Sequence, residues 1–382
     1  MKFSCTTADL LQGLQMVSRA ISGQQALPIL QNILLQSEGK LCTLSATDLE
    51  LSVVTQFPAS IENEGVITIP AKALLNFAQY TTDSEVVLET VDGTQLRCTS
   101  KQSKTLLSGE ASSEFPTITA VEKKTAFTLD ATTLLTALNF VTFASARSSL
   151  RPVLSGVYLR TEKDKLIFVA TDSYRLSEYT VNADGVGADI SCIIPVKVLD
   201  ELKMILGSRR PQKREEGDHG EQENVRVQII LNPQQIEFQI GHTRLISRLI
   251  EGKFPDYQQI IPKEPKLGAL FGARELSTVV KRMHYFAKEA NNTLTFHLSS
   301  GAVRITTPQT QIGEDEANLA VEVEGGDGKI ALSSTYLLDF LGHVPGEIVQ
   351  MRMTDAMHPA IFQLPEDPRL VHLIMPLRLQ ER

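Results

Sequence analysis

The chain has 382 residues, of which 42% are hydrophobic and 21% charged, and its formal net charge is −8. This length exceeds one ordinary core and predicts two or three globular domains. The absence of an apolar run of membrane-spanning length, or of a signal-like start, excludes a membrane partner and predicts a cytoplasmic protein.

The acidic balance excludes a protein coated in positive charge for nucleic acid. Residues 1–124 carry 9 basic and 13 acidic residues, residues 125–264 carry 17 and 18, and residues 265–382 carry 11 and 14. No third of the chain is basic, so any DNA contact must come from a local, one-sided arrangement of Lys and Arg and must be weak and salt-sensitive.

One helical pattern occurs three times along the chain, in residues 7–22, 131–146 and 273–288. Starting from Leu10, Leu134 and Leu276, apolar residues follow at i+4, i+7 and i+11, with Ser145 as the polar exception. This spacing places the apolar residues on one face of a helix. The repetition predicts an assembly of three similar modules.

A second motif follows each helix after about sixty residues, at 69–75, 194–200 and, more faintly, 332–338. Short apolar segments bounded by turn residues predict strands at 33–36, 41–44, 51–54, 86–89, 95–98, 157–159, 166–169, 190–193, 225–229 and 236–239. Each module is therefore expected to be α+β, with two short helices on one face of roughly eight strands.

The joints between modules also repeat, because Phe115-Pro116 and Phe254-Pro255 each precede a polar, lysine-containing stretch. The expected domains are 1–124, 125–262 and 263–382. Residues 207–224 lack periodic apolar residues and alternate basic and acidic blocks, which predicts a polar loop inserted in the second domain. A basic interaction site in that loop is the alternative.

The sequence contains no recognisable catalytic or metal-binding pattern. Its seven histidines lie apart, and there is no Walker A loop, G-x-S-x-G elbow or G-x-G-x-x-G fingerprint. The four cysteines form no C-x-x-C pair and are expected to be buried free thiols. The acidic run 314–316 could hold a metal, but it suits a solvated loop or an interface better. We therefore expect no enzyme activity, metal or cofactor.

Residues 170–177 (ATDSYRLS) parallel residues 46–52 (ATDLELS). Asp172 beside Arg175 could be catalytic, but recurrence of the Asp in two modules favours a turn that closes a hairpin. A function specific to the second module is expected at 174–176. The apolar end of the chain, 373–379, must pack as a final strand or line a groove that accepts an apolar peptide.

Taken together, these residues resemble the bacterial sliding clamp family, the beta subunit of DNA polymerase III. The resemblance runs from Met1-Lys2-Phe3 to 375–379 and includes 27–30, 170–172 with 175–176, 194–195 with Lys197, and 251–257. It implies three clamp domains in a crescent, closed head to tail into a homodimeric ring around duplex DNA. Twelve helices spaced about 9 Å apart enclose a circle roughly 34 Å across, and subtracting about 10 Å for helix bodies leaves room for a duplex.

The resemblance also implies the functional residues. A peptide-binding groove between the second and third domains would serve the polymerase catalytic subunit, the clamp loader, other polymerases and repair proteins through Arg151, Leu154, Thr171, Tyr174, Arg175, Leu176, Pro255, Ile260, Tyr336, Pro359, Met375, Pro376, Leu377 and Arg378. Candidates for sequence-independent DNA contact are Lys72, Arg147, Lys197, Lys203, Lys281, Arg282 and Lys288, each of which could equally be a solvated surface charge. Candidates for the dimer interface are Tyr285, Phe286, Glu314, Asp315 and Glu316.

Four departures from the family pattern carry predictions. Ser173 and Tyr174 replace a common Gly-His pair, which predicts a narrower groove or a different peptide. Gln24 and Gln25 occupy a loop that often carries a basic residue, which predicts weaker DNA contact. Residues 380–382 extend past the usual end and could partly cover the groove, and 207–224 is long for its position. A diverged clamp that keeps the ring but serves other partners is the alternative function.

Overall fold

The computed structural model describes residues 1–21, 23, 27–147, 150–183, 186, 189–208, 225–344, 346 and 348–378. The chain divides into two compact units, one formed by Met1–Thr132 with Glu201–Leu249 and the other by Thr133–Asp200 with Ile250–Arg382. The predicted second module is thus shared between the two units. Gln24, Gln25, most of the predicted polar loop (209–224) and residues 379–382 lie outside the described residues.

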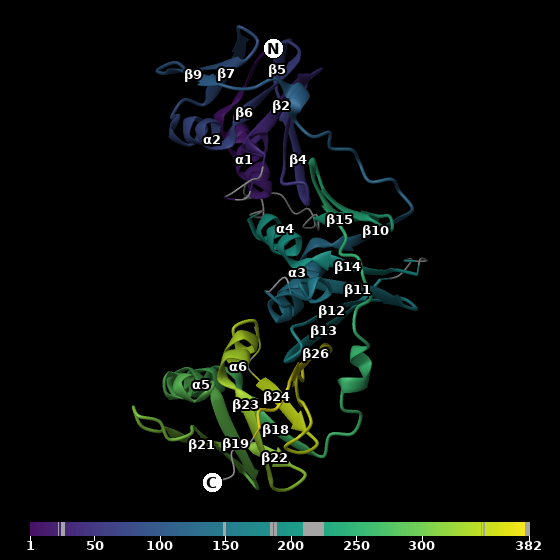
Figure 1. The fold of residues 1–382 in the computed structure, drawn as a ribbon, viewed down its shortest axis with the longest axis vertical. Coiled ribbons are helices and arrows are strands. Elements are labelled where there is room, and N and C mark those ends of the chain that lie inside the picture. Colours follow the sequence, from purple (N-terminus) through teal and green to yellow (C-terminus); the bar gives the residue numbers. More distant parts are fainter. Residues whose placement is uncertain are drawn as a thin grey trace, which may run out of the picture. The chain divides into compact units, whose positions relative to one another are not determined.

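The first unit contains two antiparallel sheets, with strand orders β5-β1-β7-β8-β9 and β10-β15-β16-β17-β4-β3-β2-β6. The strands of module one are β1 (Lys2–Thr6), β2 (Asn32–Glu38), β3 (Leu41–Thr47), β4 (Leu51–Pro58), β5 (Ser60–Asn63), β6 (Gly65–Pro70), β7 (Glu85–Val91), β8 (Gln95–Thr99) and β9 (Lys104–Ser108). Module two adds β10 (Thr125–Asp130), β15 (Arg226–Leu231), β16 (Gln235–Ile240) and β17 (Thr243–Arg248). Helices α1 (Thr7–Val17) and α2 (Ala71–Tyr80) contact each other beside these sheets (Figure 1).

The second unit has the orders β14-β11-β12-β13-β26-β25-β24-β18-β22 and β21-β20-β19-β23. Its strands from module two are β11 (Gly156–Glu162), β12 (Lys165–Thr171), β13 (Arg175–Asn182) and β14 (Ser191–Pro195). Those from module three are β18 (Leu267–Gly272), β19 (Thr293–Ser299), β20 (Ala302–Thr306), β21 (Glu316–Ala320), β22 (Glu322–Glu324), β23 (Gly328–Ser333), β24 (Ile348–Met353), β25 (Ala360–Leu364) and β26 (Asp367–Ile374). Helices α5 (Ala273–Ala287) and α6 (Ser334–Leu341) contact each other.

The other two long helices, α3 (Ala131–Val141) and α4 (Val196–Ser208), belong to module two. In the described part of the chain the three modules hold nine, eight and nine strands with two α-helices each, so the predicted α+β repeat is confirmed. The second motif of each module marks a junction where a strand leads directly into a helix, at Pro70, Pro195 and Ser333. Among the described residues, no helix has the length and apolarity needed to cross a membrane.

The repeated helices follow the predicted apolar face but end earlier than predicted in two modules. Leu10, Leu14 and Val17 are fully buried, yet α1 ends at Val17, and Ile21 has extended backbone. Likewise α3 ends at Val141 and a 3-10 turn follows it.

The prediction that helix 131–146 continues through Ser145 was therefore wrong. The Ser145 hydroxyl donates to the carbonyl of Thr142 at 2.8 Å, a local bond that competes with the helical pattern. In module three the prediction was right, because α5 buries Leu276, Val280, Met283 and Ala287.

Each large sheet is continuous across a module boundary. In the first unit β17 of module two pairs with β4 of module one, with Leu245 opposite Val53. In the second unit β26 of module three pairs with β13 of module two, with Leu373 opposite Leu176. Neighbouring modules therefore share one hydrogen-bonded sheet.

The first predicted linker, 121–124, is anchored at its first residue. Val121 is buried, and its backbone N–H donates to Oε2 of Glu237 at 3.1 Å.

The four cysteines are free and buried, as expected. Burial raises the pKa of Cys5 to about 12, which keeps that thiol protonated and unreactive.

Candidate functional site

The site begins at the hairpin between β12 and β13. Asp172 Oδ1 accepts the backbone N–H groups of Tyr174 (2.9 Å) and Arg175 (3.0 Å). Thr171 Oγ1 accepts the N–H of Ser173 at 3.1 Å, and Ser173 has a left-handed φ of 79°. The carboxylate thus closes the turn, which confirms the structural interpretation of Asp172 over the catalytic one.

Arg175 ties this hairpin to module three. Its side chain is 8% exposed and donates from Nε to Asp172 Oδ2 (3.1 Å), from Nη1 to Asp339 Oδ2, and from Nη2 to the carbonyl of Phe143 (2.8 Å). The guanidinium carbon also lies 4.8 Å from the centre of the Tyr336 ring, a cation–π geometry. These partners use all three nitrogens of the guanidinium. Arg175 is therefore a buried residue that joins the hairpin to Asp339 and Phe143.

Two tyrosines form the outer part of the site. The rings of Tyr174 and Tyr336 stack with centroids 6.4 Å apart and 17° between their planes, and Tyr174 remains 62% exposed. Burial raises the pKa of the Tyr336 phenol, and the charge of Asp172 raises it further. Beside them, Arg151 Nη1 donates to Ser173 Oγ at 3.3 Å. The basic Arg151 therefore contacts the residue that precedes Tyr174 in the chain.

The end of the chain completes the site. Strand β26 ends at Ile374, and then the N–H of Met375 donates to the carbonyl of Tyr174 (2.9 Å). The N–H of Leu377 donates to the carbonyl of Ala331 in β23 (2.8 Å). These two bonds hold the half-buried apolar segment 375–377 between the hairpin and β23 of module three. The final strand β26 is therefore followed by an ordered apolar segment at the edge of the site.

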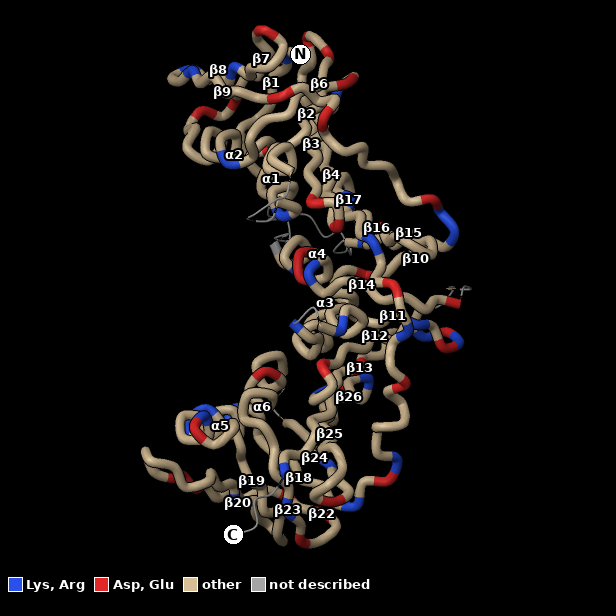
Figure 2. Tube along the Cα trace, in the orientation of Figure 1, with Lys and Arg blue, Asp and Glu red and all other residues tan. Residues whose placement is uncertain are grey.

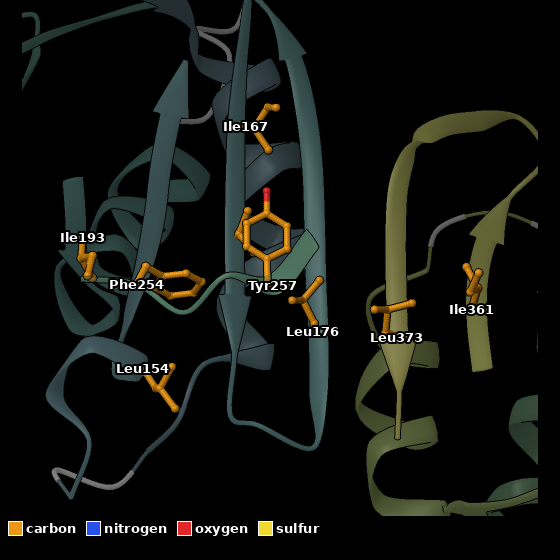
Figure 3. Close-up of a cluster of buried hydrophobic side chains, with 9 residues drawn as sticks. Leu154, Ile167, Leu176, Ile193, Phe254, Tyr257, Ile361 and Leu373 are labelled. Carbon is orange, nitrogen blue, oxygen red and sulfur yellow. The ribbon is translucent and has the colours of Figure 1, made fainter. Parts of the chain in front are cut away.

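A buried apolar cluster forms the floor (Figure 3). Phe254 and Tyr257, from the segment that joins modules two and three, lie against the sheet with Leu154, Leu176 and Leu373. The Tyr257 hydroxyl accepts from Arg160 Nε at 3.1 Å and also hydrogen-bonds Glu178. The segment is therefore fixed by both apolar and polar contacts, and its exposed Pro255 and Ile260 are positioned by them.

The structure sorts the fourteen predicted peptide-binding residues by accessibility. Five of them are buried: Leu154, Thr171, Arg175, Leu176 and Pro359. Exposed or half-buried ones can be contacted: Arg151, Tyr174, Pro255, Ile260, Tyr336, Met375, Pro376, Leu377 and Arg378. The prediction missed Asp339 and Phe143, which bind Arg175. Asp339 could have been found, since it follows Tyr336 by three residues on the same helical face.

The predicted basic residues lie on or near helices of both units. Six are exposed and Lys203 is half-buried. Figure 2 shows basic and acidic positions together on α5. There Arg282 donates to both carboxylate oxygens of Asp315, from Nε at 2.8 Å and from Nη2 at 3.1 Å. This pairing joins a predicted DNA contact to a predicted dimer residue and lowers the charge that either can offer a partner.

The other predicted dimer residues lie at the surface of module three. Tyr285 is 66% exposed and meets Phe286 edge to face, with centroids 5.5 Å apart. Glu314 is exposed, and Glu316 begins β21, an edge strand of the four-stranded sheet.

A small pocket in the first unit contains none of the predicted site residues. It is lined by Val54, Gln56, Gln239, Gly241, His242 and Arg244.

Comparison with known proteins covers the whole chain. Residues 1–119, 128–256 and 258–378 match the models of the N-terminal, central and C-terminal domains of the DNA polymerase III beta subunit. The chain is 30% identical to the beta sliding clamp of Haemophilus influenzae and 29% identical to that of Synechocystis, over 99% of this chain and 100% of each relative.

Solved structures agree with this relationship. The DNA polymerase sliding clamp of Bacillus subtilis has a TM-score of 0.91 at 25% identity, covering 99% of both chains. A sliding clamp of Pseudomonas aeruginosa bound to griselimycin has a TM-score of 0.90 at 26% identity, covering 99% of this chain and 100% of that one. With three domain matches in order and full-length relatives, the chain belongs to the beta sliding clamp family, the beta subunits of DNA polymerase III.

Proposed function

We propose that this sliding clamp works as a non-enzymatic processivity factor in the cytoplasm, closing as a head-to-tail homodimer around duplex DNA. Its proposed domains are 1–124, 125–262 and 263–382, and the in-order matches to three beta-subunit domain models support this division. The observation that carries the function is the full-length relationship to beta sliding clamps. DNA is then held by enclosure, because an acidic chain gains little from phosphate contacts.

Enclosure predicts that retention depends on DNA topology. Loaded on nicked circular DNA, the clamp should co-elute with it, and cutting the circle once should release almost all of the protein. A protein that grips DNA through contacts alone would remain bound after linearisation. Gel filtration before and after a single restriction cut measures this difference, and retention on linear DNA in moderate salt would reject the proposal.

We infer that the dimer forms between open sheet edges of module one and module three. Strand β9 ends its five-stranded sheet and exposes Lys104 and Leu106, while β21 ends its four-stranded sheet and exposes Glu316. Unpaired strand edges accept another strand. Glu316 meets Arg304 Nη1 at 3.4 Å, and Lys104 would be its second basic partner; the opposite charges of the two edges favour this pairing over self-pairing of either edge. Exposed Tyr285 and partly buried Phe286 would add apolar contact.

A charge swap tests this interface. Lys104→Glu and Glu316→Lys should each weaken the dimer by placing like charges across the edge, and the double variant should recover much of the loss. Lys101→Glu, on an exposed turn before β9, serves as the control. Sedimentation velocity over a dilution series measures the dimer fraction. Equal weakening in single and double variants would show that these two residues do not face each other.

We further propose that the surface around Tyr174, Tyr336 and residues 375–378 binds short apolar peptides. Partners would be the polymerase catalytic subunit, the clamp loader, other polymerases and repair proteins. The half-buried Met375 and Leu377, held by backbone bonds beside an exposed Tyr174, support this assignment. We expect the Tyr174–Tyr336 stack to influence which peptide binds. The proposed DNA contacts are the exposed lysines Lys72, Lys197, Lys281 and Lys288, with Arg147 and Lys203.

A further inference from the structure

The β3–β4 hairpin of module one repeats the site hairpin of module two. Asp48 Oδ1 accepts the N–H groups of Glu50 (3.0 Å) and Leu51 (2.7 Å), as Asp172 does in the β12–β13 turn. Thr47 Oγ1 accepts the N–H of Leu49 at 3.0 Å, and Leu49 has a φ of 75°, against 79° at the matching Ser173. The two turns therefore share these carboxylate and threonine bonds and a positive φ at the corresponding residue.

The elements around this hairpin match as well. Strand β17 pairs with β4 as β26 pairs with β13. The N–H of Arg248 then donates to the carbonyl of Glu50 at 3.2 Å, which reproduces the bond from Met375 to Tyr174. A 3-10 turn begins at Pro28 where another begins at Pro152. Module one thus carries a second copy of the scaffold that supports the peptide site.

This scaffold has its own apolar floor. Ile29, Leu30 and Phe115 are buried together, with Leu34 and Ile118 packed against them. Phe115 begins the segment between modules one and two, as Phe254 begins the segment that covers the larger cluster. The floor therefore also comes from corresponding elements.

The exposed residues differ in a way that points to binding. Leu27, 49% exposed, stands where the site has Arg151, and Leu49, 46% exposed, stands where it has Ser173. Since Arg151 contacts Ser173, the two leucines occupy adjacent positions of the scaffold. Leucine is unfavourable at a positive φ, and an exposed side chain gains little from burial. Local stability therefore does not explain Leu49, and strain of this kind gathers at functional positions.

We propose that Leu27, Pro28, Leu49 and Glu50, the Leu27–Leu49 surface, dock a short apolar peptide segment that carries a basic residue. The inference rests on the proposed peptide binding at the matching scaffold of modules two and three. The peptide is expected to carry a basic residue because of the charges at this surface. Glu50 stands in place of Tyr174, and Leu27 stands in place of the positively charged Arg151. The two negative charges of Asp48 and Glu50 outnumber the single positive charge of Arg248. A protein partner could then contact one chain at two places, which would raise its avidity.

The test uses the full-length chain with Met375→Ala and Leu377→Ala, so that the first peptide surface is disabled. A random heptapeptide phage library is panned against this parent protein, and enriched peptides are measured by fluorescence polarisation. We expect enrichment of sequences that combine Leu, Ile or Phe with Lys or Arg. Adding Leu27→Ser and Leu49→Gly should weaken their binding at least tenfold.

Two controls separate binding from folding. Leu41→Ser changes a leucine of similar exposure (39%) on β3 and should leave peptide affinity unchanged. Leu49→Gly suits the positive φ, so the variant should melt no lower than its parent. Enriched peptides that bind the Leu27→Ser, Leu49→Gly protein equally well, or that are acidic, would overturn the inference. The proposed function is judged separately, by the effect of the Met375 and Leu377 substitutions on a polymerase-derived peptide.

Discussion

Replacing Met375 and Leu377 together with alanine is expected to lower the affinity for a polymerase-derived apolar peptide at least 100-fold. Both residues are half-buried and held in place by their own backbone N–H bonds. Alanine keeps those bonds and removes only the side chains, so the loss reports on peptide contact. Buried anchor residues of an interface commonly contribute about 2 kcal/mol or more each. Fluorescence polarisation with the labelled peptide measures the change.

A control for this variant is Met357→Ala, which removes one methionine side chain that is 77% exposed in the loop between β24 and β25. It should bind the peptide as the unmodified chain does. Sedimentation should show an intact dimer for both proteins, since neither change touches β9 or β21. An unchanged affinity in the double variant would reject this surface as the peptide site.

Replacing Arg175 with methionine is expected to cause a larger loss of stability than any other single substitution among the residues of the proposed peptide site. Methionine fills similar space but removes the guanidinium donors to Asp172 Oδ2, Asp339 Oδ2 and the Phe143 carbonyl. Breaking a buried ion pair costs about 3–5 kcal/mol. Because Asp339 is 44% exposed at its side chain and can be rehydrated, we expect about 2 kcal/mol, seen as a lower Tm of the second unit.

Peptide affinity should fall with it, because Arg175 also lies under the Tyr336 ring. Arg175→Lys keeps the charge but not the three-way fork, and it should recover only part of both losses. Arg97→Met breaks an ion pair with Glu89 in which both side chains are only half-buried, so the variant should change Tm less. If Arg175→Met melts like the Arg97→Met control, Arg175 does not hold module two to module three.

The parts of the fold that depend on local periodicity were predictable. Leu276, Val280 and Met283 are spaced as one helical face and are buried as one. The Asp172 turn was predictable because the same short string recurs at Asp48, and a recurring carboxylate suits a turn better than a reaction. The ends of α1 and α3 were not predictable from periodicity. They depend on local hydrogen bonds such as the one that the Ser145 hydroxyl donates to the carbonyl of Thr142.

The candidate site was only partly predictable. Tyr174 and residues 375–377 stood out because they break the repeat, and the structure joins them by a backbone bond. The supporting role of Arg175 did not follow from its position, because its partners Phe143 and Asp339 are 32 and 164 residues away. Tyr174 is exposed and Leu176 is buried, and this difference depends on residues that are distant in the sequence and become neighbours only after folding.

The sequence alone determined the threefold repeat, the α+β character of each module and the absence of a catalytic pattern, because these depend on spacing and residue type along the chain. Only the tertiary structure decided that β17 joins β4 and that β26 joins β13, which makes neighbouring modules parts of one sheet. Strand pairing between distant segments is set by which edges meet after folding, and local sequence does not encode it. The same pairings bring Tyr174 to Met375 and Glu50 to Arg248, and so create both proposed peptide surfaces.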